Sequence, residues 1–161
     1  MGPAHLIAPA LLAAAFAPAS MHALEHSRSL WATVDVCSPK DQPNTIGVRG
    51  SMPGDGHPSD TLYMRFRVQY QEPSSHKWAD VAHGADSGFL KVGAAQTARQ
   101  AGRSFQFAGS GQSFTLRGYV TFQWRRGGAV MGTISRPTEG GHTSLAGADP
   151  KGYSAASCRL S

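Results

Sequence analysis

The segment Phe114-Thr-Leu-Arg-Gly-Tyr-Val-Thr-Phe-Gln-Trp-Arg125 decides the fold class. Apolar residues and one glycine take every second position, and polar or aromatic-polar residues take the positions between them. Because successive side chains of a β-strand point to opposite sides of a sheet, this period of two predicts a strand with one buried face and one solvent-facing face. Residues 61–70 repeat the pattern, so both segments are predicted to be long, half-buried strands, with 114–125 the central one.

Shorter segments with the composition of strands occur along the rest of the chain. Each is bounded by Gly, Pro, Asn, Asp or Ser, the residues that chain reversals favour. They cover residues 30–36, 45–52, 78–81, 89–92, 103–107, 130–135 and 154–158. This spacing predicts an all-β domain, and the expected architecture is an immunoglobulin-like two-sheet β-sandwich, with a small β-barrel as the alternative.

Two of the shorter segments allow a helix. Residues 75–84 begin with a residue suited to an N-cap and end with Gly84, as a short helix would. They also follow a strong strand across a short loop, which favours a second strand. Residues 94–99 are short enough that one helical turn is the most they could form.

The strand pairing around Gly127-Gly128 depends on the length of the loop. A loop of three residues, 127–129, with a bulge places Trp124 opposite Gly132 and turns Val130 and Ile134 toward the core. A loop of two residues shifts the pairing by one. We favour the three-residue loop because the inward-facing residues are then apolar on both strands.

The composition indicates one compact domain with a mild basic excess. The chain has 161 residues, of which 40% are hydrophobic and 16% charged, and 15 Lys and Arg against 10 Asp and Glu give a net charge of +5. These values exclude a collagen-like repeat, a coiled coil, a cysteine-dense mini-protein and a polytopic membrane protein. The charge is compatible with an acidic partner and predicts no specific nucleic acid.

The N-terminus resembles an export signal. Residues 6–17 form an uncharged apolar run that is too short to span a membrane, and small residues follow it. We predict a signal peptide over residues 1–23, with cleavage after Ala23 favoured over cleavage after Ala19, and a single domain over 24–161. The protein is then expected to be secreted or extracellular, with cell-wall association as one form of this, and without a permanent membrane anchor.

Cys37 and Cys158 are the two cysteines of the sequence. In an oxidising compartment such a pair predicts one disulfide, which ties the first strand to the C-terminal segment. A nucleophilic or metal-binding thiol is the alternative, and neither residue has a neighbouring Cys or His at a ligand-like spacing.

Several segments spread over most of the chain carry a family resemblance. They are Ser29-Leu-Trp-Ala-Thr-Val-Asp-Val-Cys37, Thr45-Ile-Gly-Val-Arg-Gly-Ser-Met-Pro-Gly54, Met64-Arg-Phe-Arg67, Gln123-Trp-Arg-Arg126 and Ser144-Leu-Ala-Gly-Ala-Asp149, followed by Cys158. Together they resemble a group of small exported actinobacterial proteins with a single immunoglobulin- or fibronectin III-like domain. The resemblance implies export and an Ig-like domain, and it transfers no catalytic residue.

The sequence carries no catalytic motif. A nucleophile elbow, a phosphate-binding loop and a dinucleotide fingerprint are absent. His76, Asp80 and His83 would align as metal ligands on a helix, with Asp86 nearby, but side chains alternate on the strand favoured here, so no metal or other cofactor is predicted. A small secreted enzyme or enzyme inhibitor acting through an exposed loop such as 51–59 is the alternative.

Outward positions of the two long strands form the candidate ligand-binding face. In an immunoglobulin-type sandwich these strands are neighbours, which would gather positive charge and aromatic rings on one surface. Planar guanidinium groups suit carboxylates and phosphates, and tyrosine supplies stacking area with a hydrogen-bonding tip. The residues are Tyr63, Arg65, Arg67, Arg117, Tyr119, Gln123 and Arg125.

We therefore expect a secreted, noncatalytic binding or interaction module. Its expected partner is an anionic cell-envelope polymer or an acidic protein surface. The alternative for the face itself is a purely structural role, because arginines along exposed strands also discourage aggregation.

Overall fold

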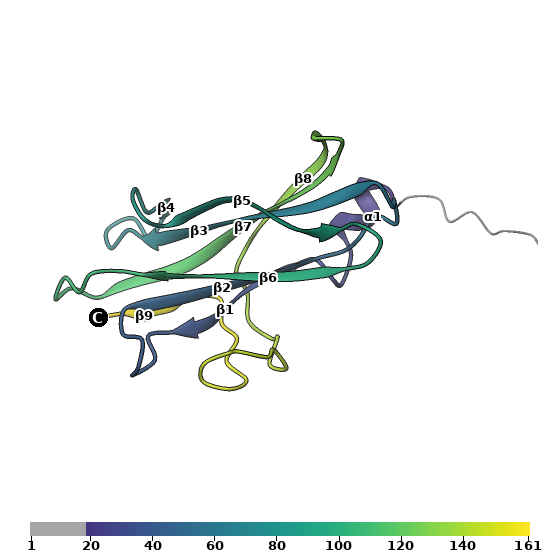
Figure 1. Cartoon of the computed structure of the whole chain (residues 1–161). Helices are drawn as coiled ribbons and strands as arrows, with labels where there is room; N and C mark the ends of the chain where they lie inside the picture. Colours follow the sequence, from purple (N-terminus) through teal and green to yellow (C-terminus); the bar gives the residue numbers. More distant parts are fainter. Residues whose placement is uncertain (1–18) are drawn as a thin grey trace, which may run out of the picture.

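The structure is a computed structural model and describes residues 19–161 (Figure 1). Most of the predicted signal peptide, residues 1–18, lies outside the described residues. No helix within 19–161 combines the length and apolar character that crossing a membrane requires. The elements, in chain order, are α1 (Met21–Glu25), β1 (Trp31–Cys37), β2 (Thr45–Met52), β3 (Asp60–Gln71), β4 (Trp78–Asp80), β5 (Asp86–Ala94), β6 (Arg99–Gln106), β7 (Phe114–Arg126), β8 (Ala129–Pro137) and β9 (Cys158–Leu160).

The strands form two curled antiparallel sheets. One sheet has the order β1-β2-β6. In the other, β3 and β7 are paired at the centre, β4 and β5 pair with the outer edge of β3, and β8 and β9 pair with the outer edge of β7. The prediction of an all-β domain is confirmed, and the arrangement is consistent with a β-sandwich or a half-barrel.

The pairing of β3 with β7 builds the middle of the core. Met64 lies opposite Phe122 and Phe66 lies opposite Val120, and all four side chains are fully buried. The residues between them point to solvent and are partly exposed. The alternation predicted from the sequence for these two strands is therefore confirmed, except at Phe114, which begins β7 and is 36% exposed.

Gly118 of β7 allows the two sheets to approach each other. A Cβ atom built at this position would lie 2.5 Å from Val48 Cγ1 of β2 and 2.7 Å from Thr138 Cγ2. Any side chain here would push the sheets apart, which explains why a glycine interrupts the apolar row of β7.

The C-terminal segment covers the outer edge of β1. The amide of Glu139 donates to the carbonyl of Ala32 at 2.8 Å, and Ala155 exchanges two backbone hydrogen bonds with Val34. The strand predicted at residues 154–158 is thus displaced: Ala155 makes an isolated bridge, and β9 begins at Cys158. These hydrogen bonds satisfy backbone donors and acceptors of β1, which would otherwise be an open sheet edge.

The predicted disulfide between Cys37 and Cys158 is confirmed. It joins the end of β1 to the start of β9, and so links the two sheets near the C-terminus (Figure 1).

The turn between β7 and β8 has two residues, and the predicted three-residue loop is wrong. Arg126 pairs directly with Ala129, and Gly127 and Gly128 both have positive φ angles, of 53° and 87°. Two consecutive positive φ angles match the twist of a tight hairpin, and glycine adopts them without steric cost.

A bulge directly after this turn restores the predicted register. Trp124 pairs with Gly132, and Ile134 is buried, as predicted. Val130, however, lies opposite Arg125 on the outward face and is 52% exposed, so its prediction as a core residue is wrong. The bulge changes side-chain parity between Val130 and Gly132, which the sequence pattern does not reveal.

Residues 75–84 contain the predicted strand. Trp78 to Asp80 form β4 and pair with residues 69–71 of β3. The chain between β5 and β6 forms a turn at residues 95–97, and no helical turn is found there.

Helix α1 closes one end of the core. Its Leu24 is 3% exposed, and Met21 contacts Gly132 of β8. Ser20 is the N-cap residue, and its hydroxyl accepts a hydrogen bond from the amide of Ala23 at 3.3 Å. Of the two predicted cleavage sites, Ala23 lies inside this helix, whereas Ala19 directly precedes its cap.

Candidate ligand-binding face

The structure brings the seven predicted face residues onto one side of the β3–β7 pair. Arg65 lies opposite Thr121, Arg67 opposite Tyr119, and Tyr63 opposite Gln123. All seven are partly exposed. We call the set Tyr63, Arg65, Arg67, Arg117, Tyr119, Gln123 and Arg125 the arginine face.

Two aromatic residues that the sequence analysis did not assign to the face extend it on the β3 side. Phe89 of β5 lies opposite Arg65, and Trp78 of β4 lies opposite Gln71. The sequence favours residues 78–81 as the strand that follows 61–70 in a hairpin, but it gives neither the side on which Trp78 lies nor the pairing of β5 with β3. A hairpin register placed on β4 and β5 could have found these two rings.

The guanidinium group of Arg125 lies over two aromatic rings, those of Tyr63 and Phe89. Its guanidinium carbon is 4.1 Å from the centroid of Tyr63 and 4.7 Å from that of Phe89. Its Nε and Nη2 atoms donate to Gln123 Oε1 at 2.9 and 2.7 Å. No carboxylate among residues 19–161 forms a salt bridge with Arg125.

Arg117 is held in the same way at the other end of β7. Its guanidinium carbon is 4.4 Å from the ring of Trp78, and its Nε donates to Gln69 Oε1 at 2.8 Å. Burial lowers the pKa of Arg117 from its ordinary value. Within the described chain Arg117 also has no carboxylate partner, so most of its N–H groups are available to a ligand.

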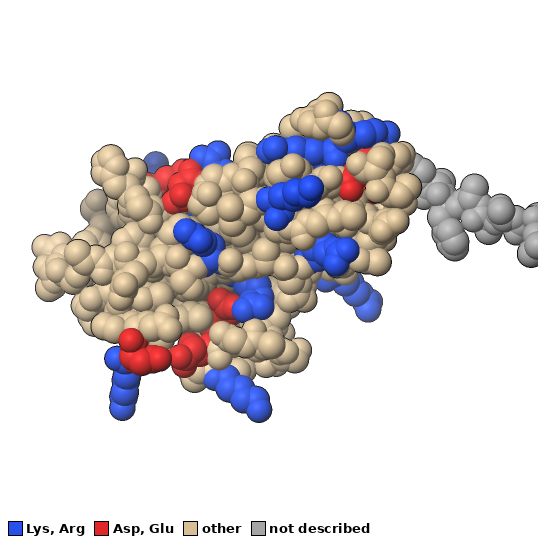
Figure 2. All heavy atoms as spheres, in the orientation of Figure 1, with Lys and Arg blue, Asp and Glu red and all other residues tan. Residues whose placement is uncertain are grey.

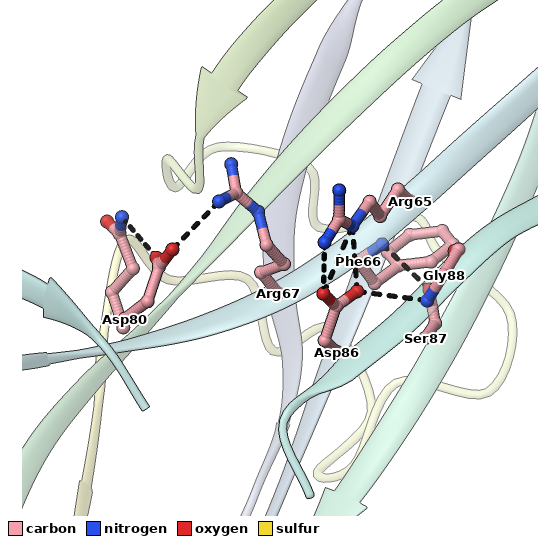
Figure 3. Close-up of polar contacts among 8 residues, drawn as sticks. Arg65, Phe66, Arg67, Asp80, Asp86, Ser87 and Gly88 are labelled. Carbon is pink, nitrogen blue, oxygen red and sulfur yellow. Dashed lines mark hydrogen bonds and ion pairs between the residues drawn. The ribbon is translucent and has the colours of Figure 1, made fainter. Parts of the chain in front are cut away.

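Arg65 and Arg67, between these two, are each paired with an aspartate (Figure 3). Arg65 Nε donates to both carboxylate oxygens of Asp86, at 2.9 and 3.1 Å, and its Nη2 also contacts Asp86. Arg67 Nη1 donates to Asp80 Oδ2 at 2.8 Å. The hydrogen bonds from Arg65 hold the pKa of Asp86 below its ordinary value.

The arginine face therefore carries two compensated and two uncompensated guanidinium groups. Arg117 and Arg125 are eight residues apart on one strand, which corresponds to about 26 Å at the usual rise of a β-strand. Lys91, opposite Tyr63, adds another positive charge near Arg125. Figure 2 shows Lys and Arg atoms denser toward the end where the chain enters the domain than toward the opposite end.

Loop 51–59, the predicted place for an enzyme site, brings Ser59 and His57 together beside Asp60, the first residue of β3. Ser59 Oγ lies 3.0 Å from His57 Nδ1, and Asp60 Oδ1 lies 3.4 Å from the same nitrogen. A catalytic triad places its serine and its aspartate on different ring nitrogens, so this arrangement does not relay a proton from Ser59.

The carboxylates near this loop have structural partners. Asp60 is buried and accepts hydrogen bonds from Arg126 at 2.6 and 3.0 Å, which hold its pKa below the ordinary value. Asp55 accepts from the amide of His57, and burial raises its pKa. Both residues fix the shape of the loop.

The residues with metal-like spacing are not arranged as ligands. Asp80 and Asp86 bind arginines, and in the part of the chain from 19 to 161 no three His, Cys, Asp or Glu side chains come together as a metal site would require.

No protein-family model matches the sequence, and no curated protein matches it. Among solved structures, the chain is similar to the Pseudomonas fluorescens alkylpurine DNA glycosylase AlkC bound to DNA containing an abasic site analog, with 14% identity and a TM-score of 0.30. The similarity covers 66% of this chain and 28% of the glycosylase chain.

Proposed function

We propose that this protein is an exported, noncatalytic module of immunoglobulin-like architecture that binds an anionic cell-envelope polymer across its arginine face. The observation that carries the proposal is the pair Arg117 and Arg125. The guanidinium of Arg117 lies over one aromatic ring and that of Arg125 over two, and each is hydrogen-bonded to a glutamine, but neither has a carboxylate partner among the described residues.

Stacked guanidinium groups are well suited to bind anions. The rings and the glutamines fix the orientation of each planar group, so that little side-chain freedom is lost when an anion binds. The free N–H groups match the two oxygens of a carboxylate or a phosphate. Arg117 and Arg125 are thus prepared to bind, whereas Arg65 and Arg67 are already neutralised.

The distance between the two arginines favours an extended ligand. A separation of about 26 Å along β7 is several times the size of one phosphate or one sugar. A linear polymer with repeated anionic groups can reach both arginines at once, and two linked contacts bind more tightly than either alone. An acidic protein surface of the same length is the alternative partner.

The test is binding to polyphosphate and to poly-glutamate, measured by fluorescence anisotropy of the labelled polymer. The Arg117→Gln, Arg125→Gln double variant is expected to bind at least tenfold more weakly than the parent. The matched control is Arg28→Gln, Arg103→Gln, which removes the same charge from exposed positions outside the face. Equal weakening in both double variants would show that net charge alone drives binding, and would refute a site on this face.

Export can be tested at the N-terminus of the protein recovered from culture medium. Cleavage after Ala19 leaves Ser20 and the whole of α1 in the mature chain, whereas cleavage after Ala23 removes the cap and most of the helix. We expect a mature N-terminus at Ser20, read by intact mass. Recovery of the full-length chain from cells alone would contradict export.

A further inference from the structure

An apolar cavity opens at the end of the core opposite α1. It has a volume of about 320 Å³ and lies beside β9, under the loop that connects β6 to β7. Both sheets contribute to its wall, with Tyr70 and Leu116 from one and Phe107, directly after β6, from the other. We propose that this cavity is a binding site for a neutral, mainly apolar small molecule with one hydrogen-bonding end group.

The side chains of the wall favour an uncharged ligand. None of the side chains that line the cavity is a Lys, Arg, His, Asp or Glu. In the view of Figure 2, the loop between β6 and β7, at the left, shows neither positive nor negative side chains. A buried ion without a partner is strongly destabilised, so the body of the ligand must be uncharged.

The size and the exposed ring of Phe114 favour an apolar body. Phe114 borders the cavity at the start of β7 and is 36% exposed, although it was predicted to face inward with the other apolar residues of this strand. A ligand in the cavity would cover this ring. A cavity of about 150 Å³ holds benzene in another protein, so this one has room for a group about twice as large.

Asn44 supplies a polar group at the rim. It lies just before β2 with a φ of 56°, and its carbonyl accepts a hydrogen bond from the amide of Phe107 at 3.0 Å, which fixes its backbone. Among residues 19–161, the hydrogen bonds of Asn44 all use its backbone, and none engages its side-chain amide. That amide is free to bind a hydroxyl, an ester or an amide of the ligand.

The experiment uses the neutral fluorescent probe N-phenyl-1-naphthylamine, followed by competition with 1-decanol and with decanoate at pH 8. We expect one probe per chain, displacement by decanol, and at least tenfold weaker displacement by the decanoate anion. Binding of more than one probe per chain, or equal displacement by the anion, would overturn the proposal.

Two variants locate the site. Gly109 lines the cavity with a backbone that any residue adopts, and a Cβ there would meet only Asn44 Nδ2, at 3.3 Å. Gly109→Leu should therefore fill the cavity and weaken probe binding at least tenfold. Ala129→Leu is the matched control, because it adds the same side chain at the exposed β7–β8 turn and should leave binding unchanged.

Asn44→Gly tests the polar group. Glycine keeps the positive φ angle that alanine would strain, so the variant removes only the amide. Loss of one neutral hydrogen bond should weaken decanol binding about fivefold.

Thermal unfolding checks that each variant is folded. If Gly109→Leu does not fold, Phe114→Ala replaces it, and unchanged probe affinity in either folded variant refutes the site. This site is independent of the arginine face, so the polymer and probe experiments can fail separately.

Discussion

The two ends of the hydrophobic core are closed by different means. At one end, α1 places Leu24 in the core, and Trp124 Nε1 donates to the carbonyl of Pro53 at 3.0 Å. At the other end, the disulfide between Cys37 and Cys158 ties the two sheets together, but the cavity beside it remains. Figure 1 shows α1 and the C-terminus at opposite ends of the molecule.

The comparison shows that linking two strands and filling the space between them are separate ways to stabilise an end of the core. Side chains that pack into a core gain from leaving water and from close contact, and they leave little void. A disulfide restricts the unfolded chain and needs no packing around it. The α1 end is therefore expected to depend on side-chain volume, and the disulfide end on the covalent link.

Removal of the disulfide should have the largest effect. The cysteines are 121 residues apart, and closing a loop of this length stabilises the folded state by about 4 to 5 kcal/mol in the chain-entropy model. The Cys37→Ser, Cys158→Ser double variant should lose about this much unfolding free energy, measured by urea denaturation.

The part of the molecule that loses stability in this double variant tests the comparison between the two ends of the core. Hydrogen exchange of the double variant should rise in β9 and in residues 114–116 of β7, which pair with it, while α1 keeps its protection. A reducing agent should destabilise the parent and leave the double variant unchanged. An equal rise of hydrogen exchange at both ends would show that the α1 end depends on the disulfide as much as the other end does.

Features of the fold that depend on local patterns are predictable from the sequence. Strict alternation in 61–70 and 114–125 predicts both central strands and the residues of the arginine face, because side-chain parity follows from the backbone alone. Two cysteines allow one intramolecular pairing. The prediction for Val130 is wrong because a bulge reverses the parity directly after the turn at Gly127-Gly128.

Features that depend on pairing between distant segments were missed. Phe89 joins the arginine face because β5 also pairs with β3, and no local pattern states that this later strand returns to the same edge. The hairpin of β4 with β3 follows from the short loop between them, but the side on which Trp78 lies depends on its register. The cavity depends on several segments meeting at one end of the core. Helix α1 was not predicted, because its five residues overlap the end of the predicted signal peptide.

Truncation of Leu24 should have the second largest effect. Leu24→Ala removes a buried side chain that packs between α1 and the sheets, and such changes cost about 2 to 3 kcal/mol at sites near the surface of a core. His22→Ala is the control, since this side chain is exposed on the same helix and should change stability by less than about 0.5 kcal/mol. The measurement is urea denaturation at pH 7. A Leu24→Ala variant as stable as His22→Ala would mean that α1 does not close this end.

The smallest expected effect is a dependence of the unfolding free energy on pH, which comes from Asp60 at the α1 end. Arg126 holds the pKa of the buried Asp60 below its ordinary value, so the folded state favours the carboxylate. This contribution is present above about pH 4, where the unfolded carboxyl is also ionised, and is lost as the pH falls through the lower folded value. Burial and, to a smaller degree, Asp60 itself raise the pKa of Asp55, so Asp55 contributes with the opposite sign, and loss of the Asp60 charge lessens this opposing contribution in the variant.

Asp60→Asn should therefore destabilise the protein at pH 7 by less than Leu24→Ala does, and the difference from the parent should shrink as the pH falls below about 4. Urea denaturation at several pH values between about 2.5 and 7 measures it, with Asp41→Asn in the exposed β1–β2 loop as the control. A difference that stays constant over this whole range would mean that the substitution disturbs packing and that the charge of Asp60 does not matter. The α1 end would then depend on side-chain volume alone, and its contrast with the disulfide end would be sharper.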